Sequence, residues 1–203
     1  MKDTTRRLWE LQDRHRDDRR RLFSAVRTAT GGERALYPGS FVDVAASMAF
    51  PWVTYVDVDR RAPSFFADED GVREIVGVGE HEWEFIHADY TNPLPLADGS
   101  FDVLVSLYAG FVSDHCTRYL GVGGHLLVNP SHGDAALASV DERYRLAGVV
   151  LSRSGDYRVR TDDLDGYLVP KDGSAPDRAA ILERGRGIAY TKPAFAYLFE
   201  RVG

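Results

Sequence analysis

The segment at residues 101–107 (FDVLVSL) is a short and nearly continuous run of apolar side chains. Such a run is typical of a strand with both faces covered, because a half-exposed strand alternates apolar and polar side chains. Further short apolar runs separate segments of helical composition, and they lie at residues 35–38, 53–56, 83–88 and 126–128. This repeated alternation of strand and helix predicts an α/β fold, in which a mostly parallel sheet carries helices on both faces.

The chain changes character after these elements. Residues 145–152 and 157–160 have strand composition, and the Arg-Ser-Gly-Asp sequence between them predicts a hairpin. An antiparallel pair of strands can therefore close the otherwise parallel sheet. Residues 161–203 are expected to form a helical extension, in which Thr191 begins a final helix. Within it, residues 170–187 are rich in turn-forming and charged side chains, which suits either a lid over a site or a surface excursion.

Residues 1–32 are predicted to be a helical appendage to the α/β core at residues 33–160. Residues 1–27 carry nine Lys or Arg against five Asp or Glu, a local charge of +4, which leaves −10 on the rest of a chain with net charge −6. No Gly or Pro precedes the glycine pair at 31–32, so we expect a helix that lies on the surface. Its arginines at 19–21 either contact phosphates or form a solvated face balanced by aspartates. The acidic remainder argues against nucleic acid as the partner.

Composition restricts the other function classes. The 203 residues fit one domain, and a hydrophobic content of 44% can fill a sizeable core. No apolar run approaches the ~20 residues that span a bilayer, and the first residues lack the apolar stretch of a secretory signal. Cys116 is the only cysteine and the six histidines show no ligand spacing, so neither an intrachain disulfide nor a metal site is expected. We therefore expect a cytoplasmic protein without a membrane segment.

Polar residues follow the predicted strands at one edge of the sheet. In an open α/β sheet, ligands bind beyond the carboxyl ends of the strands, where the strand order reverses. Gly39 follows the first strand, and a glycine there lets the backbone approach a ligand. Asp57 ends the second strand and can accept hydrogen bonds from both hydroxyls of a ribose. Asp89 follows the third strand, where it can accept a hydrogen bond from an adenine amino group, so the order of these residues predicts a nucleoside site.

Two motifs resemble those of class I S-adenosylmethionine-dependent methyltransferases. Residues 89–106 (DYTNPLPLADGSFDVLVS) are similar to the family's acidic loop and fourth strand, and residues 119–128 (YLGVGGHLLV) to the glycine pair that introduces its fifth strand. The resemblance covers about residues 33–160. It implies a three-layer, Rossmann-like sandwich with a mostly parallel seven-stranded sheet and an antiparallel end strand. It also implies S-adenosylmethionine as the cofactor and methyl transfer to a small-molecule acceptor.

The first motif differs from the family's usual pattern. Where the family has an acidic residue and a loop with two or three glycines, this chain has Tyr37-Pro38-Gly39-Ser40. We predict that Asp43, or a backbone carbonyl near residues 35–39, accepts the cofactor's ammonium group, while Tyr37 packs or donates its hydroxyl to the carboxylate. The full set of expected cofactor-binding residues comprises Tyr37, Gly39, Ser40, Asp43, Asp57, Val58, Asp89, Tyr90 and Ser106.

Residues that would act on the acceptor follow the fourth and fifth strands. Tyr108 and His132 are the predicted catalytic residues, with His132 as a general base because imidazole titrates near neutral pH. Alternatively, Ser131 or Asp134 only caps the next helix, and Tyr108 packs against the cofactor or in the core. The other candidates at this edge are Ser106, Asp114, His115 and Asn129.

Other functions stay open at this point. The altered first motif would suit a protein that uses S-adenosylmethionine for another group transfer, or one that only binds it. The basic N-terminal helix would suit an enzyme that modifies nucleic acid, whose affinity would then fall steeply with salt. A homodimer is also considered, because a chain without an inserted substrate domain can take its substrate cover from residues 1–32, from residues 161–190 or from a second subunit.

Overall fold

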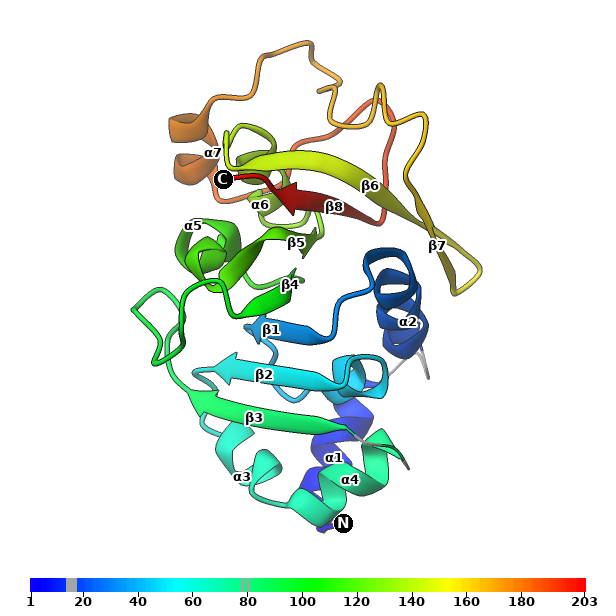
Figure 1. Ribbon diagram of the computed structural model, residues 1–203, viewed down its shortest axis with the longest axis vertical. Coiled ribbons are helices and arrows are strands. Elements are labelled where there is room, and N and C mark those ends of the chain that lie inside the picture. Colours follow the sequence, from blue (N-terminus) through cyan, green and yellow to red (C-terminus); the bar gives the residue numbers. More distant parts are fainter. Residues whose placement is uncertain (14–17, 78, 80) are drawn as a thin grey trace.

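The computed structural model describes residues 1–13, 18–77, 79 and 81–203. Its strands are β1 (Arg34–Pro38), β2 (Trp52–Asp57), β3 (Glu82–His87), β4 (Phe101–Ser106), β5 (Leu120–Val128), β6 (Tyr144–Arg153), β7 (Asp156–Arg160) and β8 (Ala196–Arg201). In this described part of the chain they form one eight-stranded sheet in the order β3-β2-β1-β4-β5-β8-β6-β7 (Figure 1).

The first five strands pair in parallel, which confirms the predicted fold class. β1 pairs with β2 and β4, β2 with β3, and β4 with β5. β8 runs antiparallel between β5 and β6, and β7 is antiparallel to β6 at the edge of the sheet. The structure differs from the expectation in two details. β8 is the eighth strand beyond the seven expected, and it lies antiparallel inside the sheet instead of at its end.

Helices pack on both faces of this sheet. They are α1 (Asp3–Gln12), α2 (Asp18–Thr30), α3 (Ala62–Phe66), α4 (Glu69–Val76), α5 (Val112–Cys116), α6 (Asp134–Ser139) and α7 (Arg178–Arg184), with the 3₁₀ helices η1 (Val44–Met48) and η2 (Thr117–Tyr119). Val103 and Val105 of β4 join a buried cluster with α2, η1 and α3, whereas Leu104 joins another with α5 and α6. Alternate residues of β4 thus enter different clusters, which explains why the strand is apolar on both sides.

The N-terminal segment packs more tightly than its charge predicts. Leu22, Phe23 and Val26 of α2 are fully buried, and the Phe23 ring meets the Tyr37 ring edge-to-face with centroids 5.8 Å apart. Each such burial stabilises the fold by roughly 1.5–3 kcal/mol. α2 thus lies on the surface of the body, as expected, and a narrow apolar stripe of three residues packs against the sheet. Residues 14–17, in the middle of the expected helix, lie outside the described residues.

The end of the chain is a strand where a final helix was expected. β8 pairs with β5 over His125–Val128 and with β6 on its other side, and its first four residues are buried. Pairing on both sides outweighs the helical propensity of the AYLFER sequence. α7 is the helix that the structure describes within the expected helical extension at 161–203. β5 also begins earlier than expected, so the glycines at 121–124 lie within a strand instead of a turn before it.

The carboxyl ends of β1, β2 and β3 lie at the same edge, on the left in Figure 1. The strand order reverses between the neighbours β1 and β4, since β2 and β3 extend the sheet one way and β5 the other. Such a reversal leaves a crevice in which ligands of open α/β sheets bind. None of the helices in the described residues is long and apolar enough to cross a membrane.

Candidate functional site

Two loops meet where the strand order reverses. The loop after β1 contains Gly39 and Phe41, with φ of 68° and 49°, and the loop after β4 contains Tyr108, with φ of 62°. A side chain in this left-handed region is strained by about 1 kcal/mol or more, and such strain is concentrated at functional sites. The loops touch, because a Cβ built on Gly39 would clash with the Cβ of Ala109. Both the φ and this contact require glycine at position 39.

Asp57, at the end of β2, holds the β1 loop. Its Oδ2 accepts a hydrogen bond from the Phe41 N–H at 2.7 Å, and its Oδ1 accepts one from the Asp59 N–H at 2.7 Å. A carboxylate offers about four acceptor positions, so each oxygen can accept a further hydrogen bond. The next residue, Val58, is 60% exposed and gives this edge an apolar surface.

Asp89 and Tyr90 follow β3, next to Asp57, whose carbonyl accepts a hydrogen bond from the Ala88 N–H at 3.2 Å. Asp89 is exposed, and its Oδ1 accepts hydrogen bonds from the N–H and the hydroxyl of Thr91 at 2.9 and 2.8 Å. These bonds hold the pKa of Asp89 below its usual value, so the carboxylate is ionised at neutral pH. Tyr90 forms a contact within the protein, because its hydroxyl donates a hydrogen bond to the Ala109 carbonyl in the β4 loop.

A buried polar cluster adjoins the β1 loop. Asp43 is 1% exposed and accepts hydrogen bonds from the Tyr37 hydroxyl at 3.1 Å and the Ala45 N–H at 3.2 Å. Burial raises the pKa of Asp43, which the positive charge of Arg19 opposes, and burial raises the pKa of Tyr37 well above its usual value. The Arg19 Nε lies 3.6 Å from Asp43 Oδ2, and its guanidinium lies 5.2 Å from the centroid of the Tyr108 ring. Through Arg19, α2 reaches the β4 loop.

A second buried carboxylate, Asp134, joins the end of β4 to α5 and α6. Its Oδ2 accepts a hydrogen bond from the Ser106 hydroxyl at 2.5 Å, and its Oδ1 accepts one from the Ser113 hydroxyl at 2.5 Å. Burial raises the pKa of Asp134 to about 6, although these hydrogen bonds oppose the shift. Ser106 is 2% exposed, so its hydroxyl is engaged inside the fold.

Hydrogen bonds connect the segments that carry the two predicted catalytic residues. The Asn129 Oδ1 accepts from the Tyr108 N–H at 3.3 Å and from the Ser131 hydroxyl at 2.8 Å. Because Ser131 uses its proton on Asn129, the 2.8 Å contact between Ser131 Oγ and His132 Nδ1 assigns the proton of the neutral ring to Nδ1. His132 then presents Nε2 as an acceptor, and both His132 and Tyr108 are exposed.

The C-terminal segment lies against the His132 loop. The Gly187 N–H donates to the Ser131 carbonyl at 3.2 Å, and a Cβ built on Gly187 would clash with the Pro130 carbonyl oxygen. Asp114 of α5 forms an ion pair with Arg178 of α7. Gly187 and Arg178 thus contact the segments that follow β5 and β4, whereas most of residues 171–187 are exposed.

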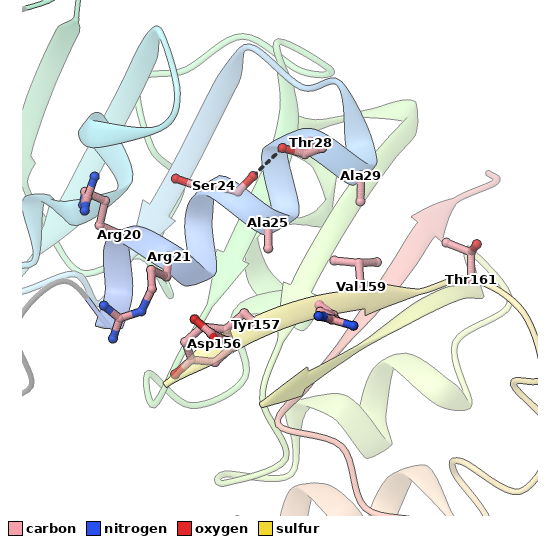
Figure 2. A pocket seen from close by; sticks show the side chains of 11 residues that line it. Arg20, Arg21, Ser24, Ala25, Thr28, Ala29, Asp156, Tyr157, Val159 and Thr161 are labelled. Carbon is pink, nitrogen blue, oxygen red and sulfur yellow. Dashed lines mark hydrogen bonds between the residues drawn. The ribbon is translucent and has the colours of Figure 1, made fainter. Parts of the chain in front are cut away.

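A groove of about 870 Å³ lies away from these loops, between α2 and β7 (Figure 2). Small α2 side chains face it, among them Ala25 and Thr28, and β7 contributes Tyr157 and Val159. Neither the β1 loop nor the β4 loop lines this groove. In the described part of the chain, no group of three or more His, Cys, Asp or Glu side chains is placed to hold a metal ion.

Comparisons with known proteins identify a fold but no close relative. No protein-family model matches the sequence, and no curated protein is significantly similar to it. The solved structure of cofactor-bound Rv0187 from MTB aligns with 69% of this chain and 76% of that chain, at 11% identity and a TM-score of 0.50. The YcgJ protein of Bacillus subtilis aligns with 93% of this chain and 100% of its own, at 13% identity and a TM-score of 0.49.

A third structure comes from Methanococcus maripaludis and is described as a candidate S-adenosyl-L-methionine-dependent methyltransferase. It aligns with 62% of this chain, at 13% identity and a TM-score of 0.48, and this chain spans 61% of it, less than two thirds. The sheet order decides the assignment. The arrangement β3-β2-β1-β4-β5-β8-β6, with β8 antiparallel to both its neighbours, is that of class I methyltransferases. This chain has the class I methyltransferase fold.

The methyltransferase fold brings Gly39, Asp57, Val58 and Asp89 together at the carboxyl edge. Four of the other expected cofactor residues form side-chain hydrogen bonds within the protein, and they are Tyr37, Asp43, Tyr90 and Ser106. Ser40 is buried, and its Oγ has no partner among the described residues. The carboxylate of Asp43, which was expected to accept an ammonium group, lies instead between Tyr37 and Arg19. Arg19 is the residue at this edge of the methyltransferase fold that sequence reasoning missed, because its charge was assigned to a solvated helix face.

Proposed function

We propose that this protein transfers a methyl group from S-adenosylmethionine to a small-molecule acceptor. The proposal is carried by Asp57 and Asp89, which stand at the ends of the neighbouring parallel strands β2 and β3 with acceptor positions free. That edge is where sheets of this class bind nucleotides.

The residues fit the nucleoside half of the cofactor. The ribose hydroxyls are donors, and the two oxygens of Asp57 each keep an acceptor position. An adenine ring has an apolar face, and the exposed side chain of Val58 follows Asp57 directly. The adenine amino group is a donor, and Asp89 is an ionised carboxylate on the next strand. Donors and acceptors therefore match in type and in order along the edge.

Two buried polar atoms beside the β1 loop lack hydrogen-bond partners in the described part of the chain and suit the amino-acid half of the cofactor. The Ser40 Oγ and the Arg19 Nη1 are both buried and have no hydrogen-bond partner among the described residues. Both belong to the surroundings of Asp43, whose N–H donates to the Ser40 carbonyl at 2.9 Å. Buried polar atoms are normally paired, and unpaired ones mark places where a ligand or water completes the bonding. These atoms support a ligand with a charged tail.

S-adenosylmethionine, when bound, supplies a methyl group on a positively charged sulfur, which is an activated donor. The protein then needs to orient the acceptor, exclude water and take up a proton where the acceptor arrives protonated. His132 would hold that proton at Nε2, the ring nitrogen left free by the bond of Nδ1 to Ser131. Asn129 accepts from both Ser131 and Tyr108, so one amide positions the segments of both side chains.

Calorimetric titration with S-adenosylhomocysteine tests the proposal. The wild type should bind it, and Asp57→Ala should weaken binding by ~1.5–3 kcal/mol, about 10- to 100-fold, the range for hydrogen bonds to a charged group. Asp98→Ala is the matched control, because Asp98 is an exposed carboxylate paired with Arg118 before β4. A folded Asp57→Ala variant with wild-type affinity would refute the assignment of Asp57.

A protein that binds the cofactor without methyl transfer is the second candidate. It is favoured by the contact between Gly39 and Ala109, which closes the β1 and β4 loops against each other, and by Tyr37 in the family's acidic position. Formation of S-adenosylhomocysteine from S-adenosylmethionine with a panel of small phenols, amines and carboxylic acids distinguishes the two. A methyltransferase forms it with at least one acceptor class, and a binding protein with none.

Nucleic acid as the acceptor is less favoured by the contacts of the N-terminal arginines. Arg19 is turned to Asp43, and the Arg21 Nε donates to the Gly155 carbonyl at 2.6 Å. The Arg21 side chain is engaged by this bond and the Arg19 side chain is only 21% exposed, so the two do not form an exposed patch for phosphates. Weak salt dependence of binding is therefore expected. The homodimer stays a prediction, and sedimentation of the purified chain checks it.

A further inference from the structure

Arg19 of α2 adjoins both the β1 loop, through Asp43, and the β4 loop, through Tyr108. Its side chain is 21% exposed, and its Nε lies 3.6 Å from Asp43 Oδ2, which is too long for a direct hydrogen bond. Its Nη1 is buried and has no acceptor among the described residues. A guanidinium carries five N–H donors in a fixed fork, and burying one of them without an acceptor is destabilising. Arg19 is thus incompletely paired within the protein.

Asp43 does not complete the pairing of Arg19. Its carboxylate already accepts hydrogen bonds from the Tyr37 hydroxyl, the Ala45 N–H and the Gln12 side chain. These donors use the acceptor positions that a bidentate pair with arginine would need. Asp43 therefore balances the charge of Arg19 without holding its N–H groups, and Arg19 keeps donors for a second carboxylate.

Tyr108 holds the guanidinium next to the open edge of the sheet. The centroid of its ring lies 5.2 Å from the Arg19 Cζ, within the range of a cation–π contact, and the side chain is 52% exposed. Its backbone is strained, with φ of 62°, and is held by Asn129 Oδ1. Strain of this kind persists where the surrounding structure imposes it, commonly at ligand clamps.

We propose that Arg19 binds the carboxylate at the methionine end of S-adenosylmethionine. The carboxylate is the anionic group of that molecule, and a planar guanidinium matches its geometry through two parallel hydrogen bonds. The proposal rests on the proposed function, because it requires this cofactor. It gives the N-terminal helix a role in binding the amino-acid end, at a site where Tyr37 and Pro38 replace the usual acidic and glycine-rich sequence.

The test compares two ligands that differ in one group. S-adenosylhomocysteine carries the carboxylate, and its decarboxylated analogue keeps the ammonium group and lacks only the carboxylate. The wild type should bind S-adenosylhomocysteine about 10- to 100-fold more tightly, as expected for charge-assisted hydrogen bonds. In Arg19→Gln this preference should fall to within about twofold. Arg20→Gln, which removes the same charge from a residue that lines the α2–β7 groove (Figure 2), should keep it.

A purely structural role for Arg19 would not change this preference, because both ligands bind the same folded protein. Arg19→Gln leaves the buried Asp43 without its counter-charge, so the double variant Arg19→Gln, Asp43→Asn removes both charges and protects the fold. Wild-type preference in either folded variant would overturn the proposal, as would equal binding of both ligands by the wild type. A wild type that binds neither ligand would instead refute the proposed function, and the role of Arg19 with it.

Discussion

The substitution Asp134→Asn should raise the stability of the protein at neutral pH. Asp134 is 1% exposed at the start of α6, and it accepts hydrogen bonds from the hydroxyls of Ser106 and Ser113. These hydroxyls come from the end of β4 and from α5, so the carboxyl group ties together the elements around the β4 loop. Asn has nearly the same shape and carries no charge, and either hydroxyl can rotate to accept from its amide.

The magnitude follows from the pKa of Asp134. Burial raises this pKa to about 6 in the folded protein from an ordinary value of 3.8, so the folded state binds the proton more tightly than the unfolded state. This tighter proton binding stabilises the folded state. Its contribution to the unfolding free energy is fully present below pH 4, declines as the pH rises, and is lost above about pH 6. A shift of roughly two pKa units corresponds to about 3 kcal/mol of unfolding free energy. The Asp134→Asn variant has no carboxyl group to ionise at this position. Its unfolding free energy would therefore not fall by this amount as the pH rises.

Urea unfolding at several values between pH 4 and pH 7.5 measures the effect. The difference in unfolding free energy between Asp134→Asn and the wild type should increase with pH and level off near pH 7, at up to about 3 kcal/mol. Asp98→Asn is the control, because it makes the same change at an exposed ion pair and should alter stability by less than about 1 kcal/mol. A difference that does not vary with pH, or an Asp134→Asn variant less stable than the wild type at pH 7.5, would refute the reasoning.

Further predictions concern other parts of the molecule. Asp89→Ala should weaken S-adenosylhomocysteine binding in calorimetry by less than Asp57→Ala does, because adenine also gains from apolar contact. Cys116 should resist thiol reagents at pH 8 until the protein unfolds, since burial raises its pKa to about 12, and rapid labelling of the native protein would contradict this. Nitrogen NMR should find the proton of neutral His132 on Nδ1, and Asn129→Ala should lose this preference; a proton on Nε2 in the wild type would refute the assigned hydrogen bonds.

The parallel half of the fold was predictable because local sequence and tertiary environment agree there. The 101–107 segment is apolar on both faces, and the structure buries both faces of β4. The hairpin of β6 and β7 was also predictable, since Ser154 and Gly155 take the positive φ that tight hairpin turns require. β8 was not predictable in this way, because its sequence favours a helix and only its two neighbouring strands make it a strand.

The site was predictable where a residue acts through its position after a strand. Asp57 is the last residue of β2 and Asp89 follows β3, as the spacing indicates. The buried carboxylates could not be assigned, because a carboxyl group in a sequence carries no sign of its burial. Asp43 turns inward to Tyr37, and the position of Arg19 beside it depends on the packing of α2 against the sheet. Contacts between segments distant in sequence determine these roles.

A structure of the protein with S-adenosylhomocysteine bound tests the central claim most directly. The methyltransferase account predicts that the ribose hydroxyls lie on Asp57, that the adenine lies beside Val58, and that the sulfur faces the edge formed by Tyr108 and His132. A sulfur that faces away from both side chains, or a β1 loop that stays closed against Ala109 with no nucleoside bound at millimolar concentration, would contradict methyl transfer and leave the fold assignment intact.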